Sequence, residues 1–416
     1  MLFDPTTIAA LPIGPKVVEL NIWAIRQGLD GADAQSLFDG YCARLVEAGL
    51  PLWRGFAAMR TLHPQWNGYG FEWRRAANAI ESESYERGGD AKAEFQNSPF
   101  AYLIKSAASG GTTSVRRRLV GPQALLDFPI LADIKAEGAS DYVAHLFPFG
   151  RTGDASQGTG VAFSFATDRA GGFDETHICL FDTTLPALAL ALKAHANHKI
   201  AASLLEAYLG ADAGRRVHNG EIQRGTAGTL RAVLWFADIR GFTRAADALA
   251  GPELIDLLDD MLECMTAPLR TRGGQVLKFL GDGLLATFAY DATNCAETCA
   301  VSLDAAAEAM RALDALNERR RAAGRPVADF DLALHLGDVL YGNIGAVDRL
   351  DFTVIGPAVN EVARLEALCE PLGRRVLVSS ALADAAQGCR GRLVPLGQHV
   401  LRGVREPRDI YALDLV

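Results

Sequence analysis

The stretches Leu234-Trp-Phe-Ala-Asp-Ile-Arg-Gly-Phe-Thr243 and Lys278-Phe-Leu-Gly-Asp-Gly283 decide the fold of the second half of this 416-residue chain. Each is an apolar, strand-like run that ends in an aspartate, Asp238 or Asp282, close to a glycine. We therefore expect both carboxylates at the rim of a sheet, where divalent cations can reach them. Because Mg²⁺ is usually bound by one or two carboxylates plus substrate phosphates, the pair indicates phosphate chemistry on a nucleotide. The alternative is two solvated turn aspartates.

A third segment, Asp351-Phe-Thr-Val-Ile-Gly-Pro-Ala-Val-Asn-Glu-Val-Ala-Arg-Leu-Glu366, favours the metal interpretation. It predicts a strand, a Gly-Pro turn and a helix, with Pro357 in the first helical turn. Asn360 and Arg364 are four residues apart, so an amide and a guanidinium share one helix face. The alternative for Arg364 is a surface ion pair with Glu361, three residues before it.

Together, these three segments resemble the catalytic domain of class III nucleotidyl cyclases, the adenylate and guanylate cyclase family. The resemblance covers roughly residues 230–416 and includes a hairpin expected in His335-Leu-Gly-Asp-Val-Leu-Tyr-Gly-Asn-Ile-Gly345 and the closing stretch Leu401-Arg-Gly-Val-Arg-Glu-Pro-Arg-Asp-Ile-Tyr411. No single motif is decisive, but their order and complementary chemistry make the combination specific.

The resemblance implies a role for each matching position. Asp238 and Asp282 match the two metal-binding aspartates, and the carbonyl of Ile239 is a further expected ligand for the two Mg²⁺ or Mn²⁺ ions of each site. Lys278 matches the lysine that hydrogen-bonds adenine, where guanylate cyclases carry an acidic residue. Thr353 replaces the second base-reading aspartate of the vertebrate membrane enzymes and is typical of the bacterial, bicarbonate-responsive subgroup. The implied substrate is ATP, because lysine can only donate and the adenine ring nitrogen accepts.

The same resemblance places Asn360 at the ribose and Arg364 at the α-phosphate, with Arg402 aligning loosely with a lysine that contacts the terminal phosphates. Two metals and one guanidinium would neutralise the charge that grows during attack of the 3′-hydroxyl. In the family the aspartates come from one subunit and the base, ribose and phosphate residues from the other. This chain carries both sets once, so we expect a homodimer with two equivalent sites.

The order of expected elements indicates an α+β, ferredoxin-like catalytic domain, in which helices segregate from an antiparallel sheet. Residues 1–200 are expected to form a separate α/β domain of PAS-like or GAF-like sensor type, with strands in Ser140–Phe149 and Gly160–Asp168 and a helix over Leu185–Leu209. The glycine-rich, polar residues 201–229 are expected to be a linker or transducer. A basic run, Ser114–Leu119, is interpreted as a solvated face or a partner to acids within the chain.

Composition limits the partners. A formal net charge of −9 argues against a general nucleic-acid surface or an anionic-lipid patch. Residues 1–6 lack the features of a secretory leader, and the apolar run Leu185–Leu192 is too short to span a membrane. We therefore expect a cytoplasmic protein. Its seven cysteines, odd in number and without framework spacing, favour reduced thiols.

The predicted function is adenylate cyclase activity, with ATP converted to cyclic AMP and pyrophosphate under control of an unknown small-molecule or protein signal at the N-terminal domain. One alternative is a cyclase-like module that senses nucleotide without turnover. A guanylate cyclase is a further alternative, disfavoured by Lys278. The residues do not predict the signal, bicarbonate sensitivity, the choice between Mg²⁺ and Mn²⁺, or the rate.

Overall fold

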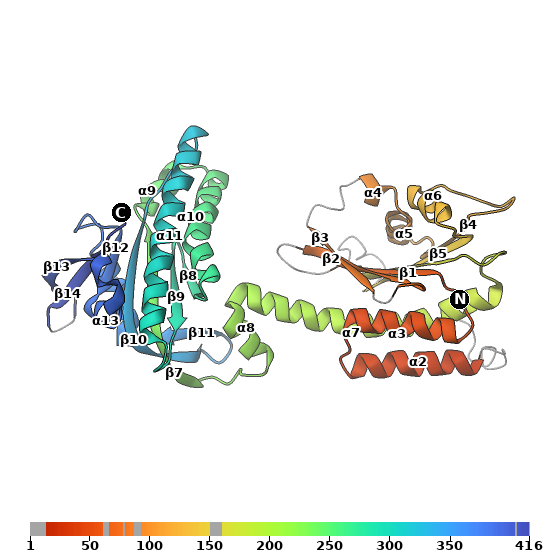
Figure 1. The fold of residues 1–416 in the computed structure, drawn as a ribbon, viewed down its shortest axis with the longest axis horizontal. Helices are drawn as coiled ribbons and strands as arrows, with labels where there is room; N and C mark the ends of the chain where they lie inside the picture. Colours follow the sequence, from red (N-terminus) through yellow and green to blue (C-terminus); the bar gives the residue numbers. More distant parts are fainter. Residues whose placement is uncertain are drawn as a thin grey trace. The chain divides into compact units, whose positions relative to one another are not determined.

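The computed structural model describes residues 14–60, 66–77, 80–86, 93–149, 160–403 and 406–415. The chain divides into two compact units, Met1–Leu204 and Leu205–Val416, each a mixture of helices and strands (Figure 1). The expectation about a secretory leader falls on residues 1–6, which lie outside the described residues.

The first unit is built on a six-stranded antiparallel sheet. Its spatial order is β3-β2-β1-β6-β5-β4. The first and last strands in sequence, β1 and β6, are therefore direct neighbours at the centre of the sheet. Strand β1 alternates buried and partly exposed residues, and β5 and β6 are buried almost continuously, as expected for strands covered on both faces. The strands are β1 (Arg54–Arg60), β2 (Trp66–Arg74), β3 (Glu81–Glu86), β4 (Ser114–Arg118), β5 (Asp141–Pro148) and β6 (Gly160–Thr167).

Helices cover both faces of this sheet (Figure 1). Helices α2 (Gly14–Leu29), α3 (Ala34–Glu47) and α7 (Glu175–Leu209) bury their apolar side chains in one cluster with β1 and β6. Helices α5 (Pro99–Ala108) and α6 (Pro129–Ala136) pack in a second cluster on the other face, where α4 (Ala93–Gln96) precedes α5. Local signals begin the helices: Asp33 caps α3, and Ser98 followed by Pro99 begins α5.

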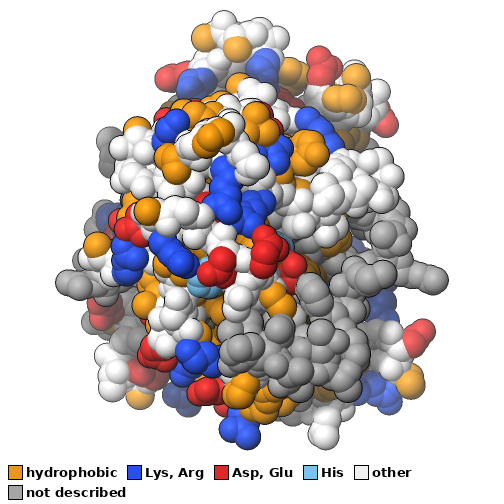
Figure 2. All heavy atoms as spheres, turned by 90° about the vertical axis from the view of Figure 1, so that its right-hand side faces the viewer, with side chains coloured by type: hydrophobic (Ala, Val, Ile, Leu, Met, Phe, Trp, Pro, Cys, Tyr) orange, Lys and Arg blue, Asp and Glu red, His pale blue; other side chains and the backbone are white. Residues whose placement is uncertain are grey.

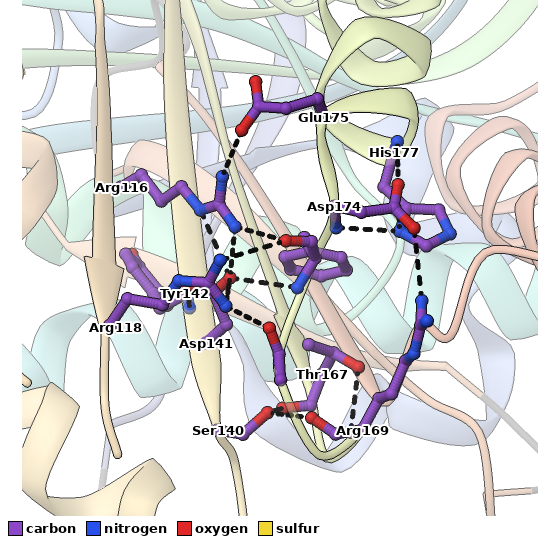
Figure 3. Close-up of polar contacts among 12 residues, drawn as sticks. Arg116, Arg118, Ser140, Asp141, Tyr142, Thr167, Arg169, Asp174, Glu175 and His177 are labelled. Carbon is purple, nitrogen blue, oxygen red and sulfur yellow. Dashed lines mark hydrogen bonds and ion pairs between the residues drawn. The ribbon is translucent and has the colours of Figure 1, made fainter. Parts of the chain in front are cut away.

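A buried carboxylate ties the start of α7 to the sheet (Figure 3). Asp141, fully buried on β5, accepts hydrogen bonds from Arg116 Nη2 at 2.9 Å and from the Phe173 amide at 3.0 Å, and Arg118 Nη1 lies 3.4 Å away. In the same basic run, Arg117 pairs with Asp127 at 2.7 Å. The interpretation of this run as a partner to acids within the chain is confirmed. On the face of the first unit in Figure 2, Lys and Arg side chains lie beside Asp and Glu side chains.

Helix α7 differs from its prediction in length. It begins at Glu175, earlier than the predicted Leu185, and ends at Leu209 as predicted, with Pro186 inside it. By length and composition, α7 is long and apolar enough to cross a membrane, so the expectation that this region is too short is wrong. Its apolar side chains, among them Phe181, Leu185 and Leu188, are buried in the core of the first unit, which accounts for their hydrophobicity.

The second unit contains a ferredoxin-like core. Strand β7 (Ala227–Ile239), helices α9 (Phe242–Ala248) and α10 (Gly251–Thr271), the hairpin β8 (Gln275–Leu280) and β9 (Gly283–Ala289), helix α11 (Cys295–Ala322) and strand β10 (Phe330–Gly345) follow in that order. The spatial order β10-β7-β9-β8 is that of a split βαβ fold. The remaining elements extend the sheet and cover it: β11 (Leu350–Ile355), α12 (Pro357–Glu366), β12 (Val376–Ser379), α13 (Ser380–Ala385), a 3₁₀ helix (Gln387–Arg392), β13 (Leu393–His399) and β14 (Arg408–Leu413).

Two expectations about this sheet are corrected. Residues 335–345 do not form a hairpin but belong to one continuous strand, β10, whose turn follows Gly345. The glycines that suggested a turn allow close packing instead, because a Cβ on Gly337 would lie 2.6 Å from Ala358 Cβ and one on Gly342 would lie 2.1 Å from Thr226 O. The sheet is also not wholly antiparallel, since β10 and β12 are parallel.

Helices lie on both faces of the second sheet as well. Helices α10, α11 and α13 share a core with one face, and α12 packs on the other. The stretch predicted as a linker contains helix α8 (Ala211–His218), whose Ala213 is buried in the cluster under α12. The composition of this stretch did not indicate the helix, because Ala213 packs against residues of β7, β9, β10, β11 and α12 that come later in the chain.

Candidate active site

The site begins where β7 ends. The buried residues of β7 place Asp238 at the rim of the sheet, half-buried, with the fully packed Ile239 after it. Across the sheet, Asp238 pairs in register with Asp331 of β10. On the other side, the last pair of the β7–β9 ladder is Ala237 with Leu284, so Gly283 lies opposite Asp238. Asp238 therefore lies at the rim of the sheet, as the sequence predicts, with β10 on one side and β9 on the other.

Gly283 allows the turn that carries Asp282 to approach Asp238. A Cβ on Gly283 would lie 2.5 Å from Asp238 Oδ1 and 2.5 Å from Ala237 O, so no larger residue fits there. The preceding Gly281 has a φ of +76°, a left-handed conformation that favours glycine. Burial raises the pKa of Asp238 to about 6, with the charges of Asp282 and Asp331 adding to the effect. Two carboxylates therefore repel each other at this rim.

Two further acids, Glu366 and Asp331, lie near this rim. The sequence did not indicate that they belong to the site. The pKa of Glu366 is raised to about 7, mainly by burial and also by the nearby charges of Asp238, Asp331 and Asp282, while Arg240 acts in the opposite direction. Arg240 Nε donates to Asp331 Oδ2 at 2.8 Å. Only the position of Glu366, two residues after Arg364 in the third segment, could have suggested it.

The donor set at the rim suits a hard divalent cation that also binds substrate. Asp238 and Asp282 supply carboxylate oxygens, and Ile239 ends β7 with its carbonyl at the same rim. In the described part of the chain, no group of three or more His, Cys, Asp or Glu side chains is arranged to hold a metal ion. Phosphate oxygens or water would have to complete the coordination, as is usual for Mg²⁺.

The expected base-reading residues lie on two other strands. Lys278 is on β8, with 43% of its side chain exposed, and its ammonium forms an ion pair with Asp351 of β11. Thr353 follows two residues later on β11 and pairs in register with Gly342 of β10. Strand β11 thus carries both Thr353 and the partner of Lys278.

The expected phosphate and ribose residues lie on α12, which begins at Pro357 as predicted. Val362 and Leu365 are buried against the sheet, which leaves Asn360 exposed and Arg364 partly exposed. Arg364 lies beside the turn after Leu401, since a Cβ on Gly403 would be 3.4 Å from its Nη2. Arg402 is exposed in that turn.

The alternative ion pair of Arg364 with Glu361 is not formed. Glu361 lies 3.6 Å from Arg408 Nε instead, and among the described residues Arg364 makes no ion pair. The guanidinium is therefore left for another anion.

The structure thus brings Asp238 together with Asp282, Lys278 with the strand of Thr353, and Arg364 with the turn of Arg402. Within the described ranges, no hydrogen bond or ion pair joins the two aspartates to Lys278, Asn360 or Arg364.

Comparison with known proteins shows which proteins the second unit resembles. Residues 229–414 match the sequence profile described as "Adenylate and Guanylate cyclase catalytic domain". The chain is similar to the adenylate cyclase of Anabaena cylindrica (34% identity, 39% of this chain and 32% of that protein) and to adenylate cyclase 1 of Rhizobium meliloti strain 1021 (28%, 42% and 26%). It therefore spans about a third or less of the length of these curated relatives.

Among solved structures, it is similar to the adenylyl cyclase CyaB from P. aeruginosa, with 26% identity, a TM-score of 0.41, and coverage of 45% of this chain and 95% of that one. The family match falls on the unit that holds the rim aspartates, α12 and β11. Residues 229–414 are therefore similar to adenylate and guanylate cyclase catalytic domains.

Proposed function

We propose that this domain converts ATP to 3′,5′-cyclic AMP and pyrophosphate in a homodimer, and that the first unit regulates it. The observation that carries the proposal is the approach of Asp282 to Asp238, which depends on Gly283, in a chain that also carries Lys278. Mutual repulsion raises the affinity of such a pair for divalent cations. When bound, two Mg²⁺ or Mn²⁺ ions would polarise the phosphates and promote deprotonation of the 3′-hydroxyl.

The chain's own residues hold the substrate. Asp238, Asp282 and the Ile239 carbonyl provide the cation ligands. Asn360 orients the ribose so that its 3′-hydroxyl faces the α-phosphate, and Arg364 stabilises the negative charge that grows there during attack. Arg402, exposed in the turn beside Arg364, would contact the terminal phosphates.

Lys278 supports ATP over GTP as the substrate. Its ammonium has three donors and no acceptor, which suits the ring nitrogen of adenine and not the corresponding N–H of guanine. Thr353 can donate or accept, so it is compatible with the adenine amino group.

A homodimer is supported by the separation of the two groups of site residues and by exposed apolar side chains on the same strands. Phe279 and Leu280 on β8, with Leu340 and Ile355 on β10 and β11, are 41–53% exposed, as expected for surfaces that a second copy covers. In this arrangement one subunit supplies the aspartates and its partner supplies Lys278, Thr353, Asn360 and Arg364.

The activity is tested by incubating the full chain with ATP or GTP and with Mg²⁺ or Mn²⁺, and measuring cyclic nucleotide. We expect cyclic AMP to dominate, and Asp238→Ala to lower the rate at least about a hundredfold. Faster formation of cyclic GMP would favour the guanylate cyclase alternative. ATP binding without turnover under any of these conditions would favour a nucleotide-sensing module.

The composite site is tested by mixing two inactive variants, Asp238→Ala and Arg364→Ala. If they exchange subunits at random, half of the dimers are mixed and each has one intact site, so about a quarter of the wild-type activity should return. No recovery in a mixture with demonstrated subunit exchange would contradict the shared site.

Regulation by the first unit is supported by its own fold and by α7. The six-stranded antiparallel sheet with helices on both faces is compatible with a PAS-like or GAF-like sensor. A 430 Å³ cleft between α5 and the segment before α6 is large enough for a small molecule and is lined by Gln96, Asn97, Ser98, Tyr102, Lys105, Asp127, Phe128 and Pro129. Helix α7 passes through the boundary between the units at Leu204.

Insertions into α7 at this boundary test the regulatory role. One added residue rotates the following helix by about 100°, whereas seven add nearly two whole turns and keep its phase. We expect the single insertion to change the rate of cyclic AMP formation severalfold and the seven-residue insertion to restore it. Equal rates in the wild type and both insertions would remove the proposal that α7 transmits a signal.

A further inference from the structure

The ion pair of Lys278 with Asp351 joins two strands that are distant in sequence and are not neighbours in the sheet. The residues are 73 positions apart, and β8 lies at one edge of the sheet while β11 pairs with β10. Both side chains are nearly half exposed, at 43% for Lys278 and 46% for Asp351. An ion pair this exposed contributes little to folding, so stability does not explain its placement.

A β-bulge directs Lys278 toward β11. In the β8–β9 ladder, Val276 pairs with Ala286 and Lys278 pairs with Leu285, so one extra residue stands between them on β8. The side chain of Leu285 belongs to the same buried cluster as Phe352 of β11. The bulge therefore places Lys278 on the same face of the sheet as Leu285, on a strand that is in contact with β11. Without it, the alternation of the strand would turn Lys278 to the opposite face.

Asp351 and Thr353 lie on one face of β11, because the buried Phe352 between them faces the core. Their positions are about 7 Å apart along the strand. Contact with Asp351 thus holds the Lys278 ammonium near Thr353, which lies two residues farther along β11. The three side chains form a set on two strands, which we name the base-reading set: Lys278, Asp351 and Thr353.

A lysine needs a partner to act as a specific donor. Its four-carbon side chain is flexible, and an unpaired, exposed ammonium would occupy many rotamers. Asp351 restricts that freedom before the nucleotide arrives. Because the ammonium has three N–H donors, it can keep the bond to Asp351 while donating another to a ring nitrogen.

We propose that Asp351 is a positioning residue for base recognition, which holds Lys278 beside Thr353 so that one N–H of the ammonium points at the acceptor nitrogen of adenine. The inference rests on the proposed function and adds a residue that the family resemblance did not supply. Asp351 acts through Lys278 and not through contact with the phosphates, so its loss affects substrate affinity more than the chemical step.

The test compares Asp351→Asn, Asp351→Glu and Asp409→Asn in the full chain, by steady-state formation of cyclic AMP. Asp409 is the matched control: an exposed strand aspartate on β14, toward the other end of the sheet from β8. We expect Asp351→Asn to raise KM for ATP about five- to tenfold with kcat changed less than about twofold. Asp351→Glu should restore most of the affinity, and Asp409→Asn should behave as the wild type.

The same assay with 1-deaza-ATP, in which C–H replaces the acceptor ring nitrogen, separates positioning from a general effect on the fold. With this substrate Asp351→Asn and the wild type should have equal KM, because the bond that Asp351 positions cannot form. An unchanged KM for ATP in Asp351→Asn, or an equal loss with both substrates, would overturn the inference. If the wild type forms no cyclic AMP, the proposed function fails, and calorimetric ATP affinities of the same variants test the inference alone.

Discussion

Gly283 lies opposite Asp238 so closely that a Cβ on the glycine would be 2.5 Å from the carboxylate oxygen Oδ1. This approach sets the distance between the two aspartates proposed to bind the cations. The β7–β9 ladder ends at Ala237 and Leu284, and the β8–β9 ladder closes the turn that carries Asp282 with the pair Leu280 and Gly283. The position of Asp282 therefore depends on how near this turn can come to β7.

We predict that Gly283→Ala lowers kcat/KM for ATP at least about a hundredfold, because the turn must move away and displaces Asp282. Gly251→Ala is the matched control, since a Cβ at the first residue of α10 meets nothing within 4 Å. Cyclase rates of the two variants, with melting temperatures to show that both fold, decide the matter. A Gly283→Ala enzyme with wild-type activity would mean that the close approach is not needed.

A second prediction concerns charge repulsion at the rim. The raised pKa of Asp238 means that its ionised form destabilises the fold, so its cost is absent at low pH and present above a pH of about 6. At pH 7.5 without divalent cations, Asp238→Asn should stabilise the protein by about 1 kcal/mol, a value reduced because the carboxylate is half exposed.

Adding Mg²⁺ should make the wild type more stable than Asp238→Asn. Cations bound at Asp238 and Asp282 stabilise the wild type by mass action, while the asparagine variant loses one charged ligand. Melting temperatures with EDTA and with a series of Mg²⁺ concentrations measure both effects. A rise with Mg²⁺ of equal size in the wild type and Asp238→Asn would argue against cation binding at Asp238.

The sequence predicts this rim because the signals are local, whereas its surroundings depend on contacts between distant residues. Apolar runs that end in Asp-Ile and Asp-Gly indicate the two strands and the turn, and Gly-Pro indicates the start of α12. The effect of Asp238 on the pKa of Glu366 and the contact of Lys278 with Asp351 arise only when the sheet has formed. The glycines of β10 were misinterpreted for a related reason. Glycine is favoured both in turns and where other atoms approach the backbone closely, and only the folded sheet distinguishes the two cases.

Asp141 provides a third prediction, in the first unit. Its buried carboxylate accepts from Arg116 and the Phe173 amide, so Asp141→Asn or Asp141→Ala removes charge-assisted hydrogen bonds that tie β4 and the start of α7 to β5 (Figure 3). We expect a loss of about 2–3 kcal/mol in the free energy of unfolding. Asp127→Asn removes the more exposed pair with Arg117 and should cost less than about 1 kcal/mol. Denaturant unfolding of both variants gives the comparison, and similar losses would contradict it.

The last prediction is a pH dependence centred on His145 of β5. Its ring is buried beside Phe181, 6.1 Å between centroids, and its Nε2 has no hydrogen-bond partner in the described part of the chain. Burial lowers its pKa to about 4, although Asp182 Oδ1 lies 3.7 Å from Nδ1, a distance too long for a hydrogen bond.

The sign of the effect follows from proton binding. The unfolded histidine takes up a proton near pH 6.5, while the folded one stays neutral until about pH 4, so the unfolded state is favoured as pH falls between these values. Above pH 6.5 the neutral His145 does not reduce stability, and between pH 6.5 and pH 4 the free energy of unfolding falls by about 3 kcal/mol because of this residue. His177, His195 and His335, whose pKa values burial also lowers, contribute in the same direction.

The difference between the wild type and His145→Leu isolates the contribution of His145, because the other histidines are common to both. We expect the leucine variant to lose less stability between pH 6.5 and pH 4 than the wild type, by up to about 3 kcal/mol. Unfolding free energies at half-unit pH steps measure the two slopes. Parallel curves would show that His145 binds its proton equally well in the folded and unfolded chains, which its burial between β5 and α7 does not allow.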